Sequence, residues 1–293
     1  MRSGRIILVL ILAVACVSTG SILTRLSTAP PLAIGFYRLS LIAFFGGLLW
    51  WSTGQSWRGL REHLGAVTLS GLFLALHFGL WITSLFYTSV ASSVLFTNLQ
   101  VIFVIFLSAL FLKERIKPGV AAGVAIALMG SFVIGGGDLL HGRILGDLLA
   151  LAGGAFFAGY LLVGRKVRSE VDIWPYTVIV SGVAAAFLGL ALMLKGYSWP
   201  GYSNLDYLLF VMMAIIPGLG GHAVFNWALK YVKAPVVSVS ILGESVGAAL
   251  LAFIVFRENL AWFQLLGGLL VLMGLSLALT RENPHEEPPG LSG

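Results

Sequence analysis

The sequence predicts an all-α integral membrane protein with ten transmembrane helices in two inverted five-helix repeats. Of its 293 residues, 58% are hydrophobic and only 10% are charged, whereas a soluble domain has about 25% charged residues. Apolar stretches of about 20 residues, the length of helix that crosses a bilayer, recur along the chain. A third observation, an internal similarity at a spacing of 144 residues, predicts the arrangement of the helices.

The apolar stretches are continuous and too long for the strands of a membrane barrel. Because backbone groups in lipid must be satisfied within their own segment, each stretch is expected to be a helix. The expected spans are 5–25, 30–51, 64–86, 89–112, 118–136, 146–164, 173–194, 207–229, 234–256 and 260–280. The first is interpreted as a span and not as a cleaved signal, because nine further spans follow it.

Lysine and arginine residues are distributed unequally between alternate loops. With the N-terminus in the cytoplasm, thirteen of them fall on the cytoplasmic side and four, Arg25, Arg143, Lys195 and Arg257, on the opposite side. The positive-inside rule therefore predicts a multi-pass protein of the cell membrane with both termini cytoplasmic. The basic residues lie in short loops without an aromatic-rich groove, so no nucleic-acid partner is expected.

An internal repeat appears when the sequence is shifted by 144 residues. The shift aligns Tyr87 with Tyr231, Glu114 with Glu258, Gly123 with Gly267 and Gly130 with Gly274, without a gap. Seven of the 48 pairs from 87 to 134 are identical, and both stretches read as an apolar run, a basic residue, a glutamate and another span. Five spans per unit is an odd number, so the second unit enters the membrane inverted. Transporters built in this way bind substrate near the midplane between the repeats.

Two stretches, GLWITSLFYTSVASSVLFTNLQVIFVIFLSALFLKERI (79–116) and GLGGHAVFNWALKYVKAPVVSVSILGESVGAALLAFIVFREN (218–259), resemble the two EamA-type repeats of the drug/metabolite transporter superfamily. The resemblance covers nearly the whole chain. It implies a first EamA-type repeat over 1–136 and a second over 146–281. It also implies a permease without ATPase that exports or exchanges small metabolites such as amino acids. The polar composition of residues 282–293 predicts a disordered cytoplasmic tail.

The sequence departs from the family pattern at two positions. The family commonly has a proline just after the glutamate of the ninth span, where this chain has Ser245. It often has another at the equivalent place of the fourth span, here Val101. A proline kink in these two helices is therefore not predicted.

Glu244 and Arg38 are the formal charges predicted to lie deep within spans. Glu244 lies about ten residues into its span, near the middle of the bilayer. An acid at that depth costs roughly 2.5 to 3.5 kcal/mol, so it is expected to face the bundle interior. Because burial disfavours its charged form, it is a candidate for proton coupling or substrate binding; the alternative is a neutral acid that joins helices. Arg38 either binds a substrate carboxylate, pairs with Glu244, or caps backbone carbonyls.

Other polar side chains are predicted to converge on the substrate pathway. The candidates, besides Arg38 and Glu244, are His77, Trp81, Thr97, Asn98, Gln100, His222, Asn226, Trp227 and Ser240. His77 and Trp81 share one helix face, as do His222 and Asn226. Gln100 is the counterpart of Glu244 in the repeat, so ion coupling is expected in the second half. Each candidate has the alternative role of an interhelical hydrogen-bond partner, and Glu114 and Glu258 are interpreted as structural.

Motifs for catalysis are missing from the sequence, which has no HExxH, GxSxG or Walker A pattern. The single cysteine, Cys16, cannot form an internal disulfide or a cysteine-based metal cluster. No cofactor or metal is expected; the expected partners are a small-molecule substrate, the lipid bilayer and, as a coupling ion, the proton. The protein is expected to be a monomer or a weak homodimer. The favoured function is export of small amphipathic metabolites by alternating access, and the alternatives are multidrug efflux of lipophilic cations and a non-transporting membrane scaffold.

Overall fold

The computed structural model describes residues 3–114, 116–135, 144–257 and 261–281, and within them all regular structure is helical. The helices are α1 (Ser3–Val17), α2 (Thr19–Leu26), α3 (Pro31–Thr53), α4 (Arg58–Glu62), α5 (Leu64–Ser84), α6 (Val90–Asn98), α7 (Gln100–Leu107), η1 (Ser108–Leu112), α8 (Pro118–Gly135), α9 (Ile144–Val167), α10 (Ile173–Leu194), α11 (Asn204–Met213), η3 (Ala214–Ala223), α12 (Val224–Ala228), α13 (Ala234–Ile241), α14 (Glu244–Phe256) and α15 (Trp262–Arg281). The predicted tail over 282–293, together with Glu258, lies outside the described residues.

The predicted spans are confirmed as helices. In the described part of the chain, nine helical segments are long and apolar enough to cross a membrane, and a shorter apolar helix covers Pro118–Ile134. Their limits differ from the predicted ones by at most three residues. Four of the segments combine consecutive helices: α1 with α2, α6 with α7 and η1, α11 with η3 and α12, and α13 with α14.

Local sequence signals set several helix ends. Pro31 occupies the first position of α3, where its missing N–H costs no helical hydrogen bond. The same helix ends at Gly54, which adopts the left-handed conformation (φ 62°) that a residue without Cβ tolerates. At the start of α11, Ser203 and Asp206 form a reciprocal capping box. These ends separate the apolar runs into distinct membrane crossings.

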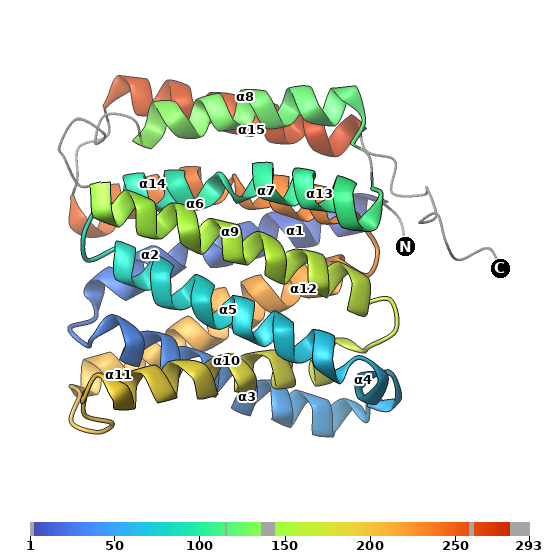
Figure 1. The fold of residues 1–293 in the computed structure, drawn as a ribbon. Coiled ribbons are helices and arrows are strands. Elements are labelled where there is room, and N and C mark those ends of the chain that lie inside the picture. The colour runs from blue at the N-terminus through green and yellow to red at the C-terminus, as the bar shows by residue number, and fades with distance from the viewer. Residues whose placement is uncertain (1–2, 115, 136–143, 258–260, 282–293) are drawn as a thin grey trace.

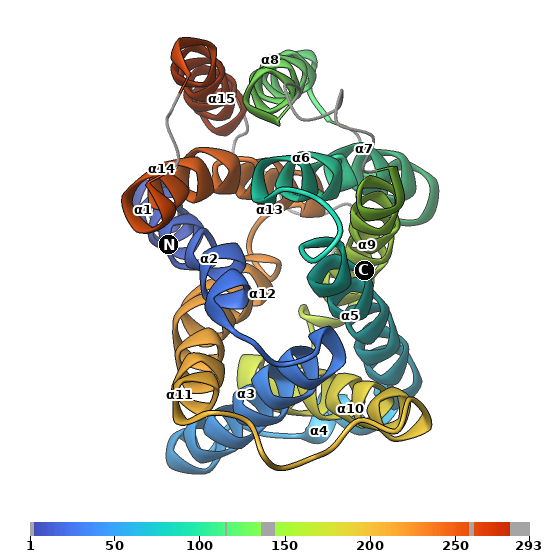
Figure 2. The ribbon, with the colours of Figure 1, turned by 90° about the vertical axis from the view of Figure 1, so that its left-hand side faces the viewer.

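The helices form one bundle whose two ends differ (Figure 1). The start of α1 and the end of α15 lie at the same end of the bundle, here called the terminal end, and the opposite one is the distal end. Figure 2 shows the helices from the distal end as a ring. Two opposite sides of this ring are the α1 wall (α1, α2, α11, η3 and α12) and the α9 wall (α5 and α9), and α8 with α15 forms a separate layer outside the ring.

Helix pairing follows a two-fold relation between the halves. The second span of each half packs against its counterpart, α3 against α10, and so does the fifth, α8 against α15. The first and third spans exchange partners: α9 packs on α5 in one wall, and α1 packs on η3 and α12 in the other. A pseudo-two-fold axis requires this pattern, in which each contact recurs with the two halves exchanged.

The α8–α15 contact shows the same relation at single residues. A Cβ added at Gly123 would lie 2.6 Å from the carbonyl oxygen of Gly274, and one at Gly130 would lie 2.5 Å from that of Gly267. Residue numbers rise along α8 as they fall along α15, so the two helices are antiparallel. Because Gly267 and Gly274 are the repeat counterparts of Gly123 and Gly130, each glycine faces the counterpart of the other. The glycines therefore bring two inverted helices into backbone contact.

We expect Gly130→Ala to destabilise the protein, because its Cβ would overlap the backbone of α15 at Gly267 and Val271. Overpacking of this kind costs about 1–3 kcal/mol. The measurement is the thermal unfolding midpoint of the purified protein in detergent. Gly47→Ala is the matched control, because a Cβ there meets nothing within 4 Å. Equal midpoints for the two variants would contradict this account of the α8–α15 contact.

Candidate functional site

Four membrane-crossing segments depart from regular α-helix in the interior of the bundle. The first is interrupted at Ser18, the fourth at Leu99, and the ninth between Ile241 and Glu244. The eighth contains the π-helical stretch η3, which includes Pro217. Irregular turns within helices are often found at functional sites because they free backbone groups and redirect side chains.

The breaks in the fourth and ninth segments form without proline. The amide of Leu99 bonds the carbonyl of Phe96, and the amide of Leu242 bonds that of Val239, so both segments tighten to a three-residue turn. Leu99 and Leu242 lie one residue apart under the 144-residue shift. The structure thus places a break at equivalent points of the two halves, although the sequence lacks the proline that would signal one.

A pocket lies where these irregular segments meet. Eight predicted pathway residues line it: Arg38, His77, Trp81, Thr97, Asn98, Gln100, His222 and Glu244. They come from α3, α5, α6, α7, η3 and α14, and thus from both halves of the chain. The cavity has a volume of about 30 Å³, room for about two or three water molecules, since one needs roughly 10–15 Å³. A larger ligand therefore requires the surrounding helices to separate.

Arg38 is almost completely enclosed, with only 1% of its surface exposed. Its Cζ lies 4.4 Å from the centre of the Phe78 ring, so the aromatic face supports the cation. Among the residues that the structure describes, none accepts a hydrogen bond from its Nε or Nη1. Buried charges are normally paired, and these donors are therefore available to an anionic group that enters the pocket.

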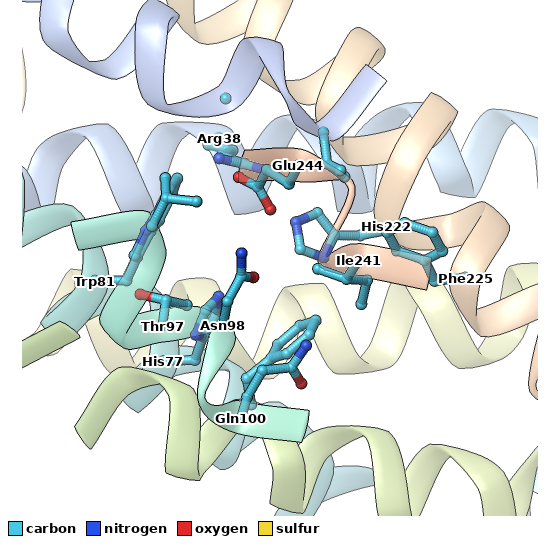
Figure 3. A pocket seen from close by; sticks show the side chains of 14 residues that line it. Arg38, His77, Trp81, Thr97, Asn98, Gln100, His222, Phe225, Ile241 and Glu244 are labelled. Carbon is cyan, nitrogen blue, oxygen red and sulfur yellow. The ribbon is translucent and has the colours of Figure 1, made fainter. Parts of the chain in front are cut away.

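Glu244 begins α14 at the break in the ninth segment and lines the same pocket as Arg38. The two side chains lie on the same side of the pocket (Figure 3), and their charges interact. Among the described residues no ion pair closer than 4 Å joins them. The pocket thus offers a cation and a carboxylate near each other, neither of which is engaged by the other at contact distance.

The remaining polar residues of the pocket are partly satisfied. His77 Nδ1 lies 3.0 Å from the carbonyl oxygen of Gly153, so this nitrogen carries the proton and donates it to the carbonyl. Asn98 Nδ2 donates to Ser245 Oγ at 2.7 Å and thereby joins the fourth and ninth segments. The Gln100 amide and His222 Nδ1 are buried and have no hydrogen-bond partner among the described residues, so they add unengaged polar atoms to the pocket.

Three predicted pathway residues lie elsewhere. Asn226 is buried and donates its side-chain amide to the Tyr160 hydroxyl, which joins α12 to α9. Trp227 is half-buried and packs against Tyr231. Ser240 donates to the Val236 carbonyl of its own helix and faces an apolar groove between α1 and α15. The sequence analysis placed these three residues on the pathway from the spacing of a regular α-helix. The irregular turns in the eighth and ninth segments change the direction in which their side chains point, so that spacing does not apply.

Six residues that line the pocket are apolar, and the sequence analysis did not identify them. The apolar members of the lining are Val17, Gly20, Val94, Phe157, Phe225 and Ile241. Aromatic residues are so frequent in this chain that no pattern separates Phe157 or Phe225 from packing residues. Only the tertiary contact of α9 and α12 with the pocket identifies them.

Two buried acids were not identified as important by the sequence analysis. Asp147 accepts hydrogen bonds from Thr88 Oγ1 and Ser92 Oγ, and so fixes the α5–α6 connection to α9. Asp206 accepts from Ser27 Oγ at 2.6 Å and from the Thr28 amide at 2.9 Å, and so fixes the α2–α3 connection to α11. Both lie at the first turn of a helix, where a carboxylate is favoured.

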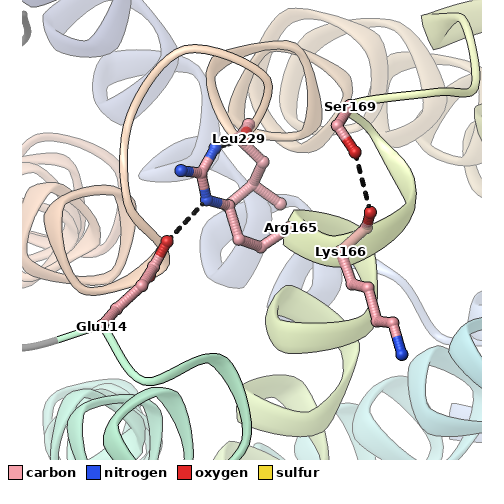
Figure 4. A network of polar contacts seen from close by, with 5 residues as sticks. All are labelled: Glu114, Arg165, Lys166, Ser169 and Leu229. Carbon is pink, nitrogen blue, oxygen red and sulfur yellow. Dashed lines mark hydrogen bonds and ion pairs between the residues drawn. The ribbon is translucent and has the colours of Figure 1, made fainter. Parts of the chain in front are cut away.

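Glu114 pairs with a distant arginine. Its Oε1 accepts from Arg165 Nε at 2.8 Å, and Arg165 Nη1 also donates to the carbonyl oxygen of Leu229 at 2.6 Å (Figure 4). The glutamate side chain is only 7% exposed. The sequence analysis interpreted Glu114 as structural, and the structure supplies Arg165 from α9 as its partner.

Known proteins similar to this chain are transporters. The model of the EamA-like transporter family matches residues 4–136 and 144–280. An "Uncharacterized transporter" of Archaeoglobus fulgidus is 26% identical over 284 residues, which are 95% of this chain and 97% of that protein. Human solute carrier family 35 member G1 is 28% identical over 200 residues, 63% of this chain and 53% of the human protein.

A solved crystal structure has the same fold. It aligns with a TM-score of 0.78 and 20% sequence identity over 96% of this chain and 99% of the other. At this identity the likeness concerns the fold alone.

We expect the double variant Arg38→Met/Glu244→Gln to be at least as stable as the parent protein. Replacing buried charges by neutral side chains of similar volume is neutral or stabilising by about 1–4 kcal/mol. The thermal unfolding midpoint in detergent without added ligand is the measurement. Asn98→Leu serves as the contrast, because it removes a made interhelical bond and is expected to cost about 1 kcal/mol. If the double variant unfolds at a lower temperature than Asn98→Leu, the charges of Arg38 and Glu244 stabilise the fold, which contradicts this expectation.

Proposed function

Because the chain belongs to the EamA-like transporter family, we propose that it exports small zwitterionic metabolites, with amino acids as the leading class, by alternating access. The observation that carries the choice of substrate is the juxtaposition of Arg38 and Glu244 in one pocket without an ion pair between them. An α-amino acid carries its ammonium and carboxylate groups on one carbon. It can therefore bind to both residues at once.

Each charged group of the substrate has a suitable partner. The guanidinium of Arg38 is a permanently charged donor that suits a carboxylate, and its Nε and Nη1 have no hydrogen-bond partner in the described part of the chain. The carboxylate of Glu244 complements the ammonium group. Trp81, Phe157 and Phe225 provide an apolar wall for the substrate side chain, while the amide of Gln100 adds a donor and an acceptor.

The proposed membrane orientation places the terminal end of the bundle in the cytoplasm and the distal end outside the cell. The support is the distribution of Lys and Arg residues, thirteen against four. A cavity of about 30 Å³ is too small for an amino acid, so the described conformation corresponds to a closed state between two open ones. Alternating access then requires one end of the bundle to open at a time.

Proton coupling is assigned to Glu244 within this proposal. In the low dielectric of the pocket, the charged form of a carboxylate is disfavoured unless a cation accompanies it. Substrate ammonium and proton would therefore compete for the same group, as an antiporter requires. Efflux of lipophilic cations is the weaker alternative, because Arg38 places a permanent positive charge in the same pocket.

We expect the purified protein in liposomes to exchange internal amino acid for external labelled amino acid, and Arg38→Met/Glu244→Gln to abolish this exchange. A quaternary ammonium dye is expected not to compete. The matched control is Lys195→Gln, an exposed residue outside the spans, which should exchange at the rate of the parent. Dye transport without amino-acid exchange would replace the proposal by cation efflux, and no flux of either would favour a scaffold.

We further expect Glu244→Gln to separate exchange from coupling. The variant should lose uptake driven by a pH gradient, because glutamine cannot bind and release a proton. It should retain part of the substrate counter-exchange, because Arg38 still binds the carboxylate. Both activities are measured with the same labelled substrate in proteoliposomes. Full pH-driven uptake by the variant would remove Glu244 from the coupling mechanism.

A further inference from the structure

Two arginines at opposite ends of the bundle make the same contact in the two halves of the chain. Arg25 lies in the last turn of α2, and its Nη1 donates to the carbonyl oxygens of Leu85 at 2.9 Å and Thr88 at 3.2 Å. Arg165 lies in the last turn of α9, and its Nη1 donates to the carbonyl oxygen of Leu229 at 2.6 Å.

The acceptors are counterparts in the internal repeat, because Leu229 follows Leu85 by 144 residues. The donors occupy similar places, since each lies in the last turn of the first membrane segment of its half, and each acceptor follows the third segment of the same half. The 144-residue shift aligns Arg25 with Ser169, which lies about one helical turn from Arg165. The two contacts are therefore similar contacts at corresponding places of the two halves. Inversion of the second half places one contact at the distal end and the other at the terminal end of the bundle.

Both contacts join the two walls of the ring across the pathway. Arg25 reaches from the α1 wall to the end of α5 in the α9 wall. Arg165 reaches from the α9 wall to the residue that follows α12 in the α1 wall (Figure 4). The pocket lies between them, because the lining residues Gly20 and Phe157 precede Arg25 and Arg165 in their respective segments.

The surroundings of each contact are rigid on both sides. At the distal end, Asp147 fixes the α5–α6 connection that carries Thr88, and Asp206 fixes the connection that follows Arg25. At the terminal end, Glu114 holds Arg165 Nε, so that Nη1 is directed toward Leu229. At the terminal end, Arg168 Nε also donates to the Asn226 carbonyl, and the Asn226 amide donates to Tyr160, so these bonds join the same two walls. Each arginine is thus one charged link between the walls at its own end of the bundle. It is a suitable point for one end to open while the rest of each wall keeps its packing.

From this repeated geometry we infer that Arg25 and Arg165 are equivalent latches, one for each mouth of the pathway, and that releasing either opens its own end of the pocket. The inference rests on the proposed alternating-access transport and extends it by naming the groups that hold each mouth closed. Both latches are engaged in the described conformation, in agreement with the small volume of the pocket. A charge-assisted hydrogen bond to a carbonyl is strong enough to bias a two-state equilibrium and weak enough to be broken in each cycle.

The test measures access to the pocket from each side of the membrane. A reporter cysteine replaces Thr97 in the lining, and Cys16→Ala removes the one native cysteine. Right-side-out and inverted vesicles are treated with a membrane-impermeant maleimide, and the initial rate of labelling is recorded. Arg25→Gln is expected to raise labelling from the distal side about tenfold, the effect of losing one charge-assisted hydrogen bond, and to leave the other side unchanged.

Arg165→Gln is expected to have the opposite effect, with faster labelling from the terminal side only. Lys195→Gln and Lys166→Gln are matched controls, since both are exposed cationic residues near the same ends of the bundle, and they should label like the parent. Where a glutamine variant does not fold, the corresponding lysine variant is used. Lysine retains a charged donor, so a smaller increase on the same side is expected.

Unchanged labelling in both arginine variants, or an equal increase from both sides, would overturn the inference. Labelling requires no substrate, so the result is independent of whether amino acids are transported. Side-specific labelling without amino-acid flux would leave the latches in place and reject only the proposed substrate. Amino-acid flux in the parent protein, with no side-specific change of labelling in the arginine variants, would support the proposed substrate and reject the latches.

Discussion

A guanidinium that cannot release its proton lies within the membrane-crossing bundle, and the organisation around the pocket depends on that constraint. Arg38 would be costly in lipid, so α3 must turn it inward and other segments must enclose it. The Phe78 ring and the charge of Glu244 lower the cost of burial. Neither occupies its Nε or Nη1 donors, and the enclosed charge therefore keeps the capacity to bind an anion.

The same low-dielectric interior explains why the pocket coincides with irregular helices. A continuous α-helix satisfies all its backbone groups and projects side chains at fixed angles. The turns at Leu99 and between Ile241 and Glu244 interrupt that regularity in both halves, and they bring Asn98, Gln100 and Glu244 to one cavity. Inversion of the halves makes the two breaks meet, and it also sets the two arginine contacts at opposite ends.

The two halves are related but not equivalent. Their common features are structural: the glycine contact of α8 with α15, the breaks in the fourth and ninth segments, and the arginine contacts at the ends. The chemical groups differ, because Gln100 stands opposite Glu244 and Arg38 has no basic counterpart within a span. A nearly symmetric frame thus carries one asymmetric site, an arrangement that is compatible with the proposed alternating-access transport.

The sequence by itself determined the ten helices and the inverted arrangement, because a bilayer demands long apolar runs and an odd number of spans per repeat inverts the second unit. It also indicated Arg38 and Glu244 as candidate site residues, since a charge within the membrane is costly and is found mainly where it has a partner or a function. Only the tertiary structure decided which polar residues share the pocket. The break in the ninth segment, which no proline predicts, places Ser240 outside the pocket, and Asn226 and Trp227 follow the π-helical stretch around Pro217 and also lie elsewhere. Phe157 and Phe225, in contrast, join the lining. The partner of Glu114 likewise came from a segment 51 residues away, through packing that no local pattern encodes.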